Sequence, residues 1–100
     1  MEPQTAKEVY DQIIARMNKQ GGGYSNWYCG ITSDWEARLF SEHQVSRQNS
    51  WWIALQCYDN EAARNVEAAL LKLGCDGGVG GGDENTVYVY AYLKSAVTNP

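Results

Sequence analysis

Two charged side chains at the borders of predicted helices are suited to bind a phosphate and a metal ion. Arg38 lies at the margin of an apolar helix face, where its planar guanidinium can present a fork of donors to a phosphate. Glu67 lies at the edge of the apolar stripe of a later helix, where its carboxylate can hold a divalent cation while its stem packs. Arg38 belongs to the segment NWYCGITSDWEARLFSEH, which also contains Tyr28 and the only histidine, His43. The segment is either a strand that runs into a helix or half of an active site.

Each of these residues also has an ordinary structural explanation. Tyr28 suits a strand aromatic, and Arg38 with Glu42 has the i,i+4 spacing of a solvated ion pair worth roughly 0.2–0.5 kcal/mol. Glu67 can pair with a basic neighbour on its own helix, Arg64 or Lys72. His43 near a helix C-terminus is favoured by the helix dipole alone. The chemical explanation therefore depends on the joint spacing of these residues.

Three helices and three strands are predicted to position these side chains. Helical patterns follow the capping box at Thr5, run from Asp34 to His43 after a second capping-box pattern at Ser33, and run from Asp59 or Asn60 to Gly74. Strand patterns cover residues 26–32, 51–58 and 86–93. We therefore expect one small α+β domain over residues 1–100, with a three-stranded, mainly antiparallel sheet flanked by three helices.

The last predicted strand, TVYVYAYL, alternates tyrosines with small apolar residues. Tyr88, Tyr90 and Tyr92 share one face, because side chains of a strand alternate between its two sides. The residues after it, TNP, are expected to fray.

The glycine-rich segment at residues 77–82 precedes this strand. It follows a helix, lacks the lysine of a phosphate-binding loop, and is flanked by the acidic Asp76, Asp83 and Glu84. A connection is therefore favoured over a phosphate cradle, although glycines would also let a ligand approach the backbone closely.

Composition limits the function classes. The formal net charge is −4, which is unfavourable for a general nucleic-acid binder with a basic stripe. The three cysteines, Cys29, Cys57 and Cys75, have no metal-binding spacing and are expected to be small buried groups. No apolar run is long enough to span a membrane, and no signal peptide is visible, so we expect a soluble cytoplasmic protein.

The segment WYCGITSDWEARL resembles the second strand and following helix of the GIY-YIG nuclease family. Tyr28, Cys29 and Gly30 stand in place of that family's Tyr-Ile-Gly, and Arg38 follows the glycine by about two helical turns. EAARNVEAALLKLG resembles the later helix that carries the family's metal-binding glutamate, which places Glu67 at that position. The resemblance covers roughly residues 26–74.

The resemblance implies single-metal hydrolysis of a phosphodiester in DNA. Glu67 would bind one Mg²⁺, and Arg38 would neutralise charge on the phosphate oxygens. Tyr28 would activate or orient the attacking water, and His43 could assist proton transfer. Gly30 would support the site.

The chain departs from the family pattern before Tyr28. The family's first strand, which carries Gly-Ile-Tyr, is replaced here by a helix and GGGYSN. We hypothesise that residues 86–93 take the place of that strand, with Tyr88 or Tyr90 supplying the second hydroxyl. This hypothesis requires the last strand to pair antiparallel with residues 27–32. Asn85 is a poor substitute for the family's late asparagine.

Two other functions are compatible with the same sequence. The first is a non-catalytic module that binds nucleic acid or protein on the same scaffold, which the negative charge and the incomplete motif favour. The second is ligand binding on aromatic platforms, in which Trp27, Trp51, Trp52 and the tyrosine row stack on bases or sugars.

Overall fold

The computed structural model describes residues 1–21, 23–78 and 80–100. Its elements follow the order α1 (Ala6–Gln20), η1 (Tyr24–Asn26), β1 (Trp27–Thr32), η2 (Ala37–Glu42), β2 (Trp52–Gln56), α2 (Asn60–Leu73), β3 (Asp76–Gly77) and β4 (Tyr88–Leu93). The predicted α+β class is therefore confirmed.

The last strand of the chain lies inside the sheet, which has the order β2-β4-β1-β3. β4 pairs antiparallel with β1, from Tyr88 opposite Thr32 to Leu93 opposite Trp27, and pairs antiparallel with β2 on its other side. The antiparallel pairing required by the rearranged strand order is therefore present.

The prediction of three strands was wrong by one short strand. β3 pairs parallel with β1 through only two residue pairs, Tyr28 with Asp76 and Cys29 with Gly77. Two residues are too few to produce an alternating pattern, so the sequence offered no signal for this strand.

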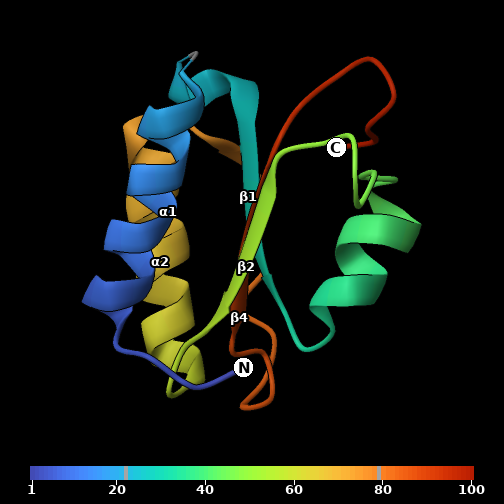
Figure 1. Ribbon diagram of the computed structural model, residues 1–100. Helices are drawn as coiled ribbons and strands as arrows, with labels where there is room; N and C mark the ends of the chain where they lie inside the picture. The colour runs from blue at the N-terminus through green and yellow to red at the C-terminus, as the bar shows by residue number, and fades with distance from the viewer. Residues whose placement is uncertain (22, 79) are drawn as a thin grey trace.

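Two layers of helix cover the two faces of the sheet. α1 and α2 lie side by side on one face, and η2 lies on the opposite face (Figure 1). The alternation along β4 divides its side chains accordingly, because Val89 and Ala91 belong to the cluster under α1 and α2, whereas Tyr90 and Tyr92 belong to the cluster under η2.

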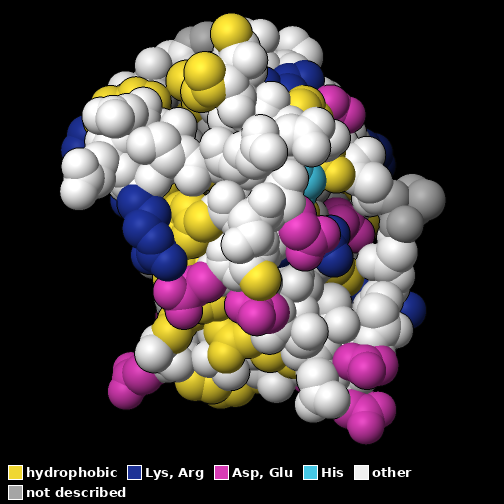
Figure 2. Space-filling model, turned by 90° about the vertical axis from the view of Figure 1, so that its right-hand side faces the viewer, with side chains coloured by type: hydrophobic (Ala, Val, Ile, Leu, Met, Phe, Trp, Pro, Cys, Tyr) yellow, Lys and Arg dark blue, Asp and Glu magenta, His cyan; other side chains and the backbone are white. Residues whose placement is uncertain are grey.

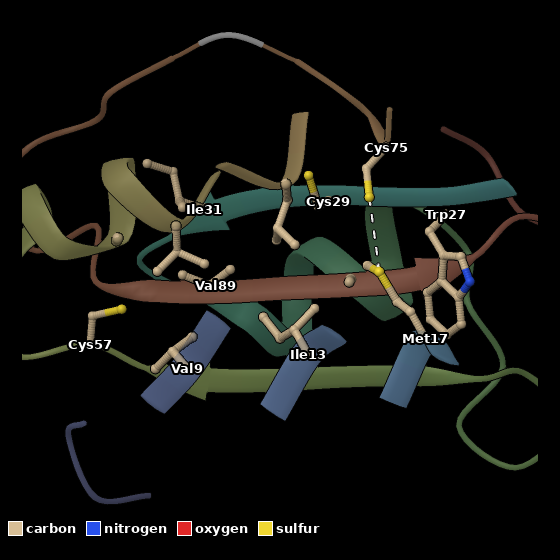
Figure 3. Packing of buried hydrophobic residues seen from close by; sticks show 13 residues of the cluster. Val9, Ile13, Met17, Trp27, Cys29, Ile31, Cys57, Cys75 and Val89 are labelled. Atoms are coloured by element: carbon tan, nitrogen blue, oxygen red, sulfur yellow. Dashed lines mark hydrogen bonds between the residues drawn. The ribbon is translucent and has the colours of Figure 1, made fainter. Parts of the chain in front are cut away.

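The core under α1 is built from the predicted four-residue repeat. Val9, Ile13 and Met17 are at most 1% exposed and point at the sheet (Figure 3). Figure 3 also shows Cys75 aimed at Met17, with the thiol Sγ donating to the methionine Sδ over 3.9 Å. All three cysteines are buried, as the sequence predicts.

The strand predicted over residues 51–58 was too long at both ends. Trp51 is 52% exposed and Tyr58 is 66% exposed, and the residue pairs with β4 run from Trp52 to Gln56. β2 lies at the edge of the sheet, so a continuous apolar run does not mean burial on every side. No helix within the described ranges has the length and apolar character to cross a membrane.

Candidate functional site

A cavity of about 270 Å³ lies against the outer edge of β1. β3 pairs only with Tyr28 and Cys29, so the rest of this edge has no strand partner. The cavity is bordered by residues of β1, by the glycine-rich segment that leaves β3, and by side chains from η2, α2 and β4. An open sheet edge is a place where side chains from both faces can meet.

Tyr28, Arg38 and Glu67 all line this cavity. Tyr28 comes from β1, Arg38 from η2 on one face of the sheet, and Glu67 from α2 on the other face. The structure therefore brings three side chains that lie far apart in the chain to the wall of one cavity.

Glu67 is a buried carboxylate at the cavity wall, with a relative exposure of 9%. Its ordinary helix partners would be Arg64 and Lys72, but neither forms an ion pair with it in the described part of the chain. Burial raises the pKa of Glu67 above its usual value, and no neighbouring charge is among the causes. A cation that enters the cavity would therefore stabilise the charged form of this carboxylate.

Arg38 is presented by an unusually wound helix. The N–H of His43 donates to the Arg38 carbonyl at 3.0 Å, an i to i+5 bond, and η2 is a π-helix over Ala37–Glu42. Such turns are rare and frequently occur at functional sites. The predicted capping box at Ser33 was wrong in detail, because Asp34 accepts from the N–H of Ala37 at 3.1 Å instead.

The Arg38 guanidinium is incompletely satisfied. Its Nε lies 3.5 Å from Glu42 Oε1, as the i,i+4 spacing predicts, but the pair is half exposed and contributes little stability. Among the described residues this buried Nε has no hydrogen-bond partner. An arginine carries five N–H donors, so the guanidinium of this cavity-lining residue has donors besides the buried Nε that could bind an anion.

Gly30 and Tyr90 form a cross-strand pair that shapes the cavity floor. They are direct partners in the β1–β4 ladder, so both side-chain positions lie on the same face. A Cβ at Gly30 would lie 2.5 Å from the Tyr90 hydroxyl oxygen, so the glycine leaves room for this phenol. Both residues line the cavity.

His43 lies in a layer behind the cavity and is not part of its wall. It is 6% exposed, and its Nε2 is 2.9 Å from the Tyr90 hydroxyl. The Tyr28 ring also packs against the imidazole at 4.7 Å between centroids. His43 is therefore linked to the cavity by its hydrogen bond to Tyr90, whose side chain lines it.

Burial dominates the titration of these aromatic groups. Burial raises the pKa values of Tyr28 and Tyr90, and the nearby Arg38 offsets part of the rise for both. Burial lowers the pKa of His43, which favours the neutral imidazole. Deprotonating Tyr28 or Tyr90 to a phenolate therefore costs free energy. A proton transfer that passes through either phenol has to end on another group.

The remaining sequence candidates fall outside the cavity or in its loop wall. Tyr88 is half-buried opposite Thr32 and does not line the cavity, and Asn85 is exposed. Gly78, Gly80 and Gly82 do line it, which agrees with a segment that permits close approach. Residue 79 lies outside the described residues.

The aromatic platform proposed from the sequence is mostly core. Trp27 is 0% exposed and Tyr92 is also fully buried, so neither ring can stack on a ligand. Trp52 stacks on Trp35 at 5.7 Å between centroids within the cluster under η2. Trp51 alone of these candidates is largely exposed.

Sequence reasoning missed three polar contributors, Thr32, Ser33 and Thr86. Thr32 lines the cavity and follows Tyr28 and Gly30 at two-residue spacing, a signal that strand alternation could have supplied. Thr86 also lines it, but it follows the glycine-rich segment, where no periodic pattern exists.

The cavity contains one acidic ligand candidate rather than a metal cluster. Within the described ranges, no group of three or more histidine, cysteine, aspartate or glutamate side chains is placed to hold a metal ion. The site therefore has the composition of an arginine, a carboxylate and two phenols around an open strand edge. Comparison with known proteins finds no family model, no curated protein and no solved structure that matches this chain.

Proposed function

We propose that this chain is a metal-dependent phosphodiester hydrolase of the GIY-YIG-like kind that acts on DNA. The observation that carries the proposal is the shared cavity of Tyr28, Arg38 and Glu67, reached from three separate elements. The position of β4 beside β1 adds support, because it puts a second phenol, Tyr90, into the same cavity.

The residues present fit Mg²⁺ held jointly with a substrate phosphate. Glu67 is a buried carboxylate for which no partner is found among residues 1–21, 23–78 and 80–100. Mg²⁺ in proteins is commonly bound by one or two carboxylates, substrate phosphates and water. When bound, the ion would polarise the phosphate and stabilise the leaving oxygen.

The other side chains then bind the phosphate and position the water. Arg38, which lines the cavity, would pair with the non-bridging phosphate oxygens through its guanidinium N–H groups and stabilise the charge that develops on them. Tyr28, whose hydroxyl lies against the glycine-rich segment, would orient the attacking water. The glycines lining the cavity would let the sugar–phosphate backbone approach closely.

A second candidate, a non-catalytic binding module, is favoured by the charge distribution. The face that includes η2 carries interspersed acidic and basic side chains and no continuous basic area (Figure 2). A protein with such a face and a net charge of −4 would contact few phosphates at once. In this alternative Arg38 would bind an anionic group of a partner without turnover.

A plasmid-nicking assay with Mg²⁺ or Mn²⁺ separates the two functions. The wild-type chain should nick supercoiled DNA, and Glu67→Gln and Arg38→Ala should each reduce the rate by at least about 100-fold if they act in the transition state. Binding that survives Glu67→Gln, without any cleavage by the wild type, would support the binding module.

Glu61→Gln is the matched control. Glu61 lies on the same helix as Glu67, but it is exposed and does not line the cavity. It should retain nicking close to the wild-type rate. Equal loss in both glutamine variants would mean that the effect comes from α2 as a whole. Absence of any DNA interaction at low salt would eliminate the hydrolase and a module that binds nucleic acid.

A further inference from the structure

The segment after β4 is attached to the end of η2 through Asn99, although the last three residues, TNP, were expected to fray. The backbone N–H of Asn99 donates to the His43 carbonyl at 2.7 Å, and its side-chain amide donates to the Glu42 carbonyl at 3.4 Å. The Asn99 carbonyl lies 2.8 Å from His43 Nδ1. Three contacts to two adjacent residues make this a specific attachment.

These contacts determine which imidazole nitrogen carries the proton. A backbone carbonyl can only accept, so His43 Nδ1 must be the N–H that donates to Asn99. In the neutral imidazole Nε2 is then an acceptor, and its partner at 2.9 Å, the Tyr90 hydroxyl, must donate. The Tyr92 hydroxyl, 3.1 Å from Nδ1, can only share the same N–H as an additional acceptor.

We propose that the segment after β4 is a positioning element, in which the Asn99 carbonyl holds His43 as the Nδ1–H tautomer and thereby directs the Tyr90 proton away from the cavity. The oxygen of Tyr90 then presents its lone pairs to the cavity it lines. Neutrality of His43 is supported by its burial, which lowers its pKa.

The consequence for catalysis rests on the proposed hydrolase function. A water molecule in the cavity can pass a proton to the Tyr90 oxygen while Tyr90 passes its own proton to His43 Nε2. Hydroxide and an imidazolium result, with one proton moved through each of two hydrogen bonds. This route avoids a free Tyr90 phenolate, whose formation is disfavoured because burial raises the pKa of the phenol.

The tautomer can be measured without DNA or metal. In chains with ¹⁵N-labelled histidine, long-range ¹H–¹⁵N correlation spectra near pH 8 distinguish a protonated Nδ1 from a protonated Nε2. The wild-type chain should show Nδ1 with the shift of a protonated nitrogen and Nε2 with that of an acceptor. An Nε2–H tautomer in the wild-type chain overturns the proposal, whatever the variants do.

Two variants test whether Asn99 is the cause. A chain ending at Val97 lacks the carbonyl, so its His43 signals should move away from the pure Nδ1–H pattern. Asn99→Gly keeps the backbone carbonyl and loses only the side-chain contact to Glu42, so it should keep the wild-type pattern. A shortened chain that stays folded with an unchanged tautomer would overturn the role of Asn99.

The tautomer spectra and the nicking assay test the positioning role and the hydrolase function separately. If the Nδ1–H tautomer is found but no nicking occurs, the proposed function fails and the positioning role stands. If nicking occurs with the other tautomer, the positioning role fails alone. If both hold, shortening the chain and Tyr90→Phe should lower kcat by similar factors of about 10–100 with little change in KM, because a positioning group acts on the chemical step.

Discussion

At the scale of single residues, Glu67 combines a cost in stability with its proposed role. Burial raises its pKa in the folded state above its ordinary value of 4.5. The folded state therefore binds a proton more tightly than the unfolded state. The stabilisation of the fold by this tighter binding is fully present below pH 4.5 and is lost as the pH rises through the folded pKa. An unpaired carboxylate at the cavity wall is therefore a destabilising feature at neutral pH.

Glu67→Gln should accordingly raise stability at pH 7 by roughly 1 kcal/mol and have almost no effect near pH 4. The measurement is urea unfolding of both chains at the two pH values. The exposed Glu61→Gln serves as the control and should not show this pH-dependent gain. A loss of stability at pH 7 would show that the carboxylate has a stabilising partner in the folded chain.

Gly30→Ala tests the close contact on the cavity floor. The added methyl group would lie 2.5 Å from the Tyr90 hydroxyl oxygen and 2.7 Å from Tyr90 Cζ, so the buried ring must move. We expect a loss of about 1–3 kcal/mol in urea unfolding, the usual cost of overpacking.

The control for this substitution is Gly23→Ala. Gly23 has a φ of −74°, and the nearest atom to an added Cβ is 3.8 Å away, so alanine fits there without strain. It should be neutral or stabilising by up to about 1 kcal/mol. If Gly30→Ala changes the free energy of unfolding no more than Gly23→Ala does, the Tyr90 ring moves aside at little cost and the cavity floor is not rigid.

At the scale of elements, α2 positions Glu67 through its two ends. Asp59 accepts from the N–H of Ala62 at 2.8 Å, and Gly74 ends the helix with a φ of 114°. Asp59→Ala should cost about 0.5–2 kcal/mol, whereas Asp59→Asn retains the capping oxygen and should cost much less. Thermal unfolding of the two variants measures the difference, and equal losses would assign the effect to charge rather than to capping.

The shortness of β3 is what creates the site. A longer strand would pair with the rest of β1 and close the edge at which Arg38 and Glu67 meet. β3 ends at Gly77, where a Cβ would lie 2.6 Å from the Cys29 carbonyl oxygen, so glycine permits this close pairing. The pairing of β3 with β1 therefore depends on glycine at position 77, where the two backbones approach closely.

At the scale of the whole molecule, charge limits how DNA can be bound. The chain has 8 basic and 12 acidic residues, and the face shown in Figure 2 mixes both signs. We expect weak binding to duplex DNA with a slope of log K against log salt no steeper than about −3, which corresponds to roughly three phosphate contacts.

Fluorescence anisotropy of a labelled duplex over a series of salt concentrations measures this slope. Arg38→Ala should make it shallower by about one unit if the guanidinium contacts a phosphate. A slope near −6 or steeper would indicate an extended basic surface, which the composition does not predict.

The sequence by itself predicted most of the local elements and several of the side chains that line the cavity. Capping residues, glycine stops and apolar spacing are short-range signals, which is why α1, α2, β1 and β4 were predicted to within a few residues. Arg38 and Glu67 were selected because each lies at the border of an apolar helix face, whereas Tyr28 was selected from the resemblance to the Tyr-Ile-Gly motif.

Tertiary structure alone decided how these elements meet. The two-residue β3, the attachment of Asn99 to His43, and the position of His43 behind Tyr90 depend on contacts between residues far apart in the chain. Periodicity reports only which face of an element is apolar. Which edge of the sheet stays open, and which polar groups meet there, is determined by packing across the whole fold.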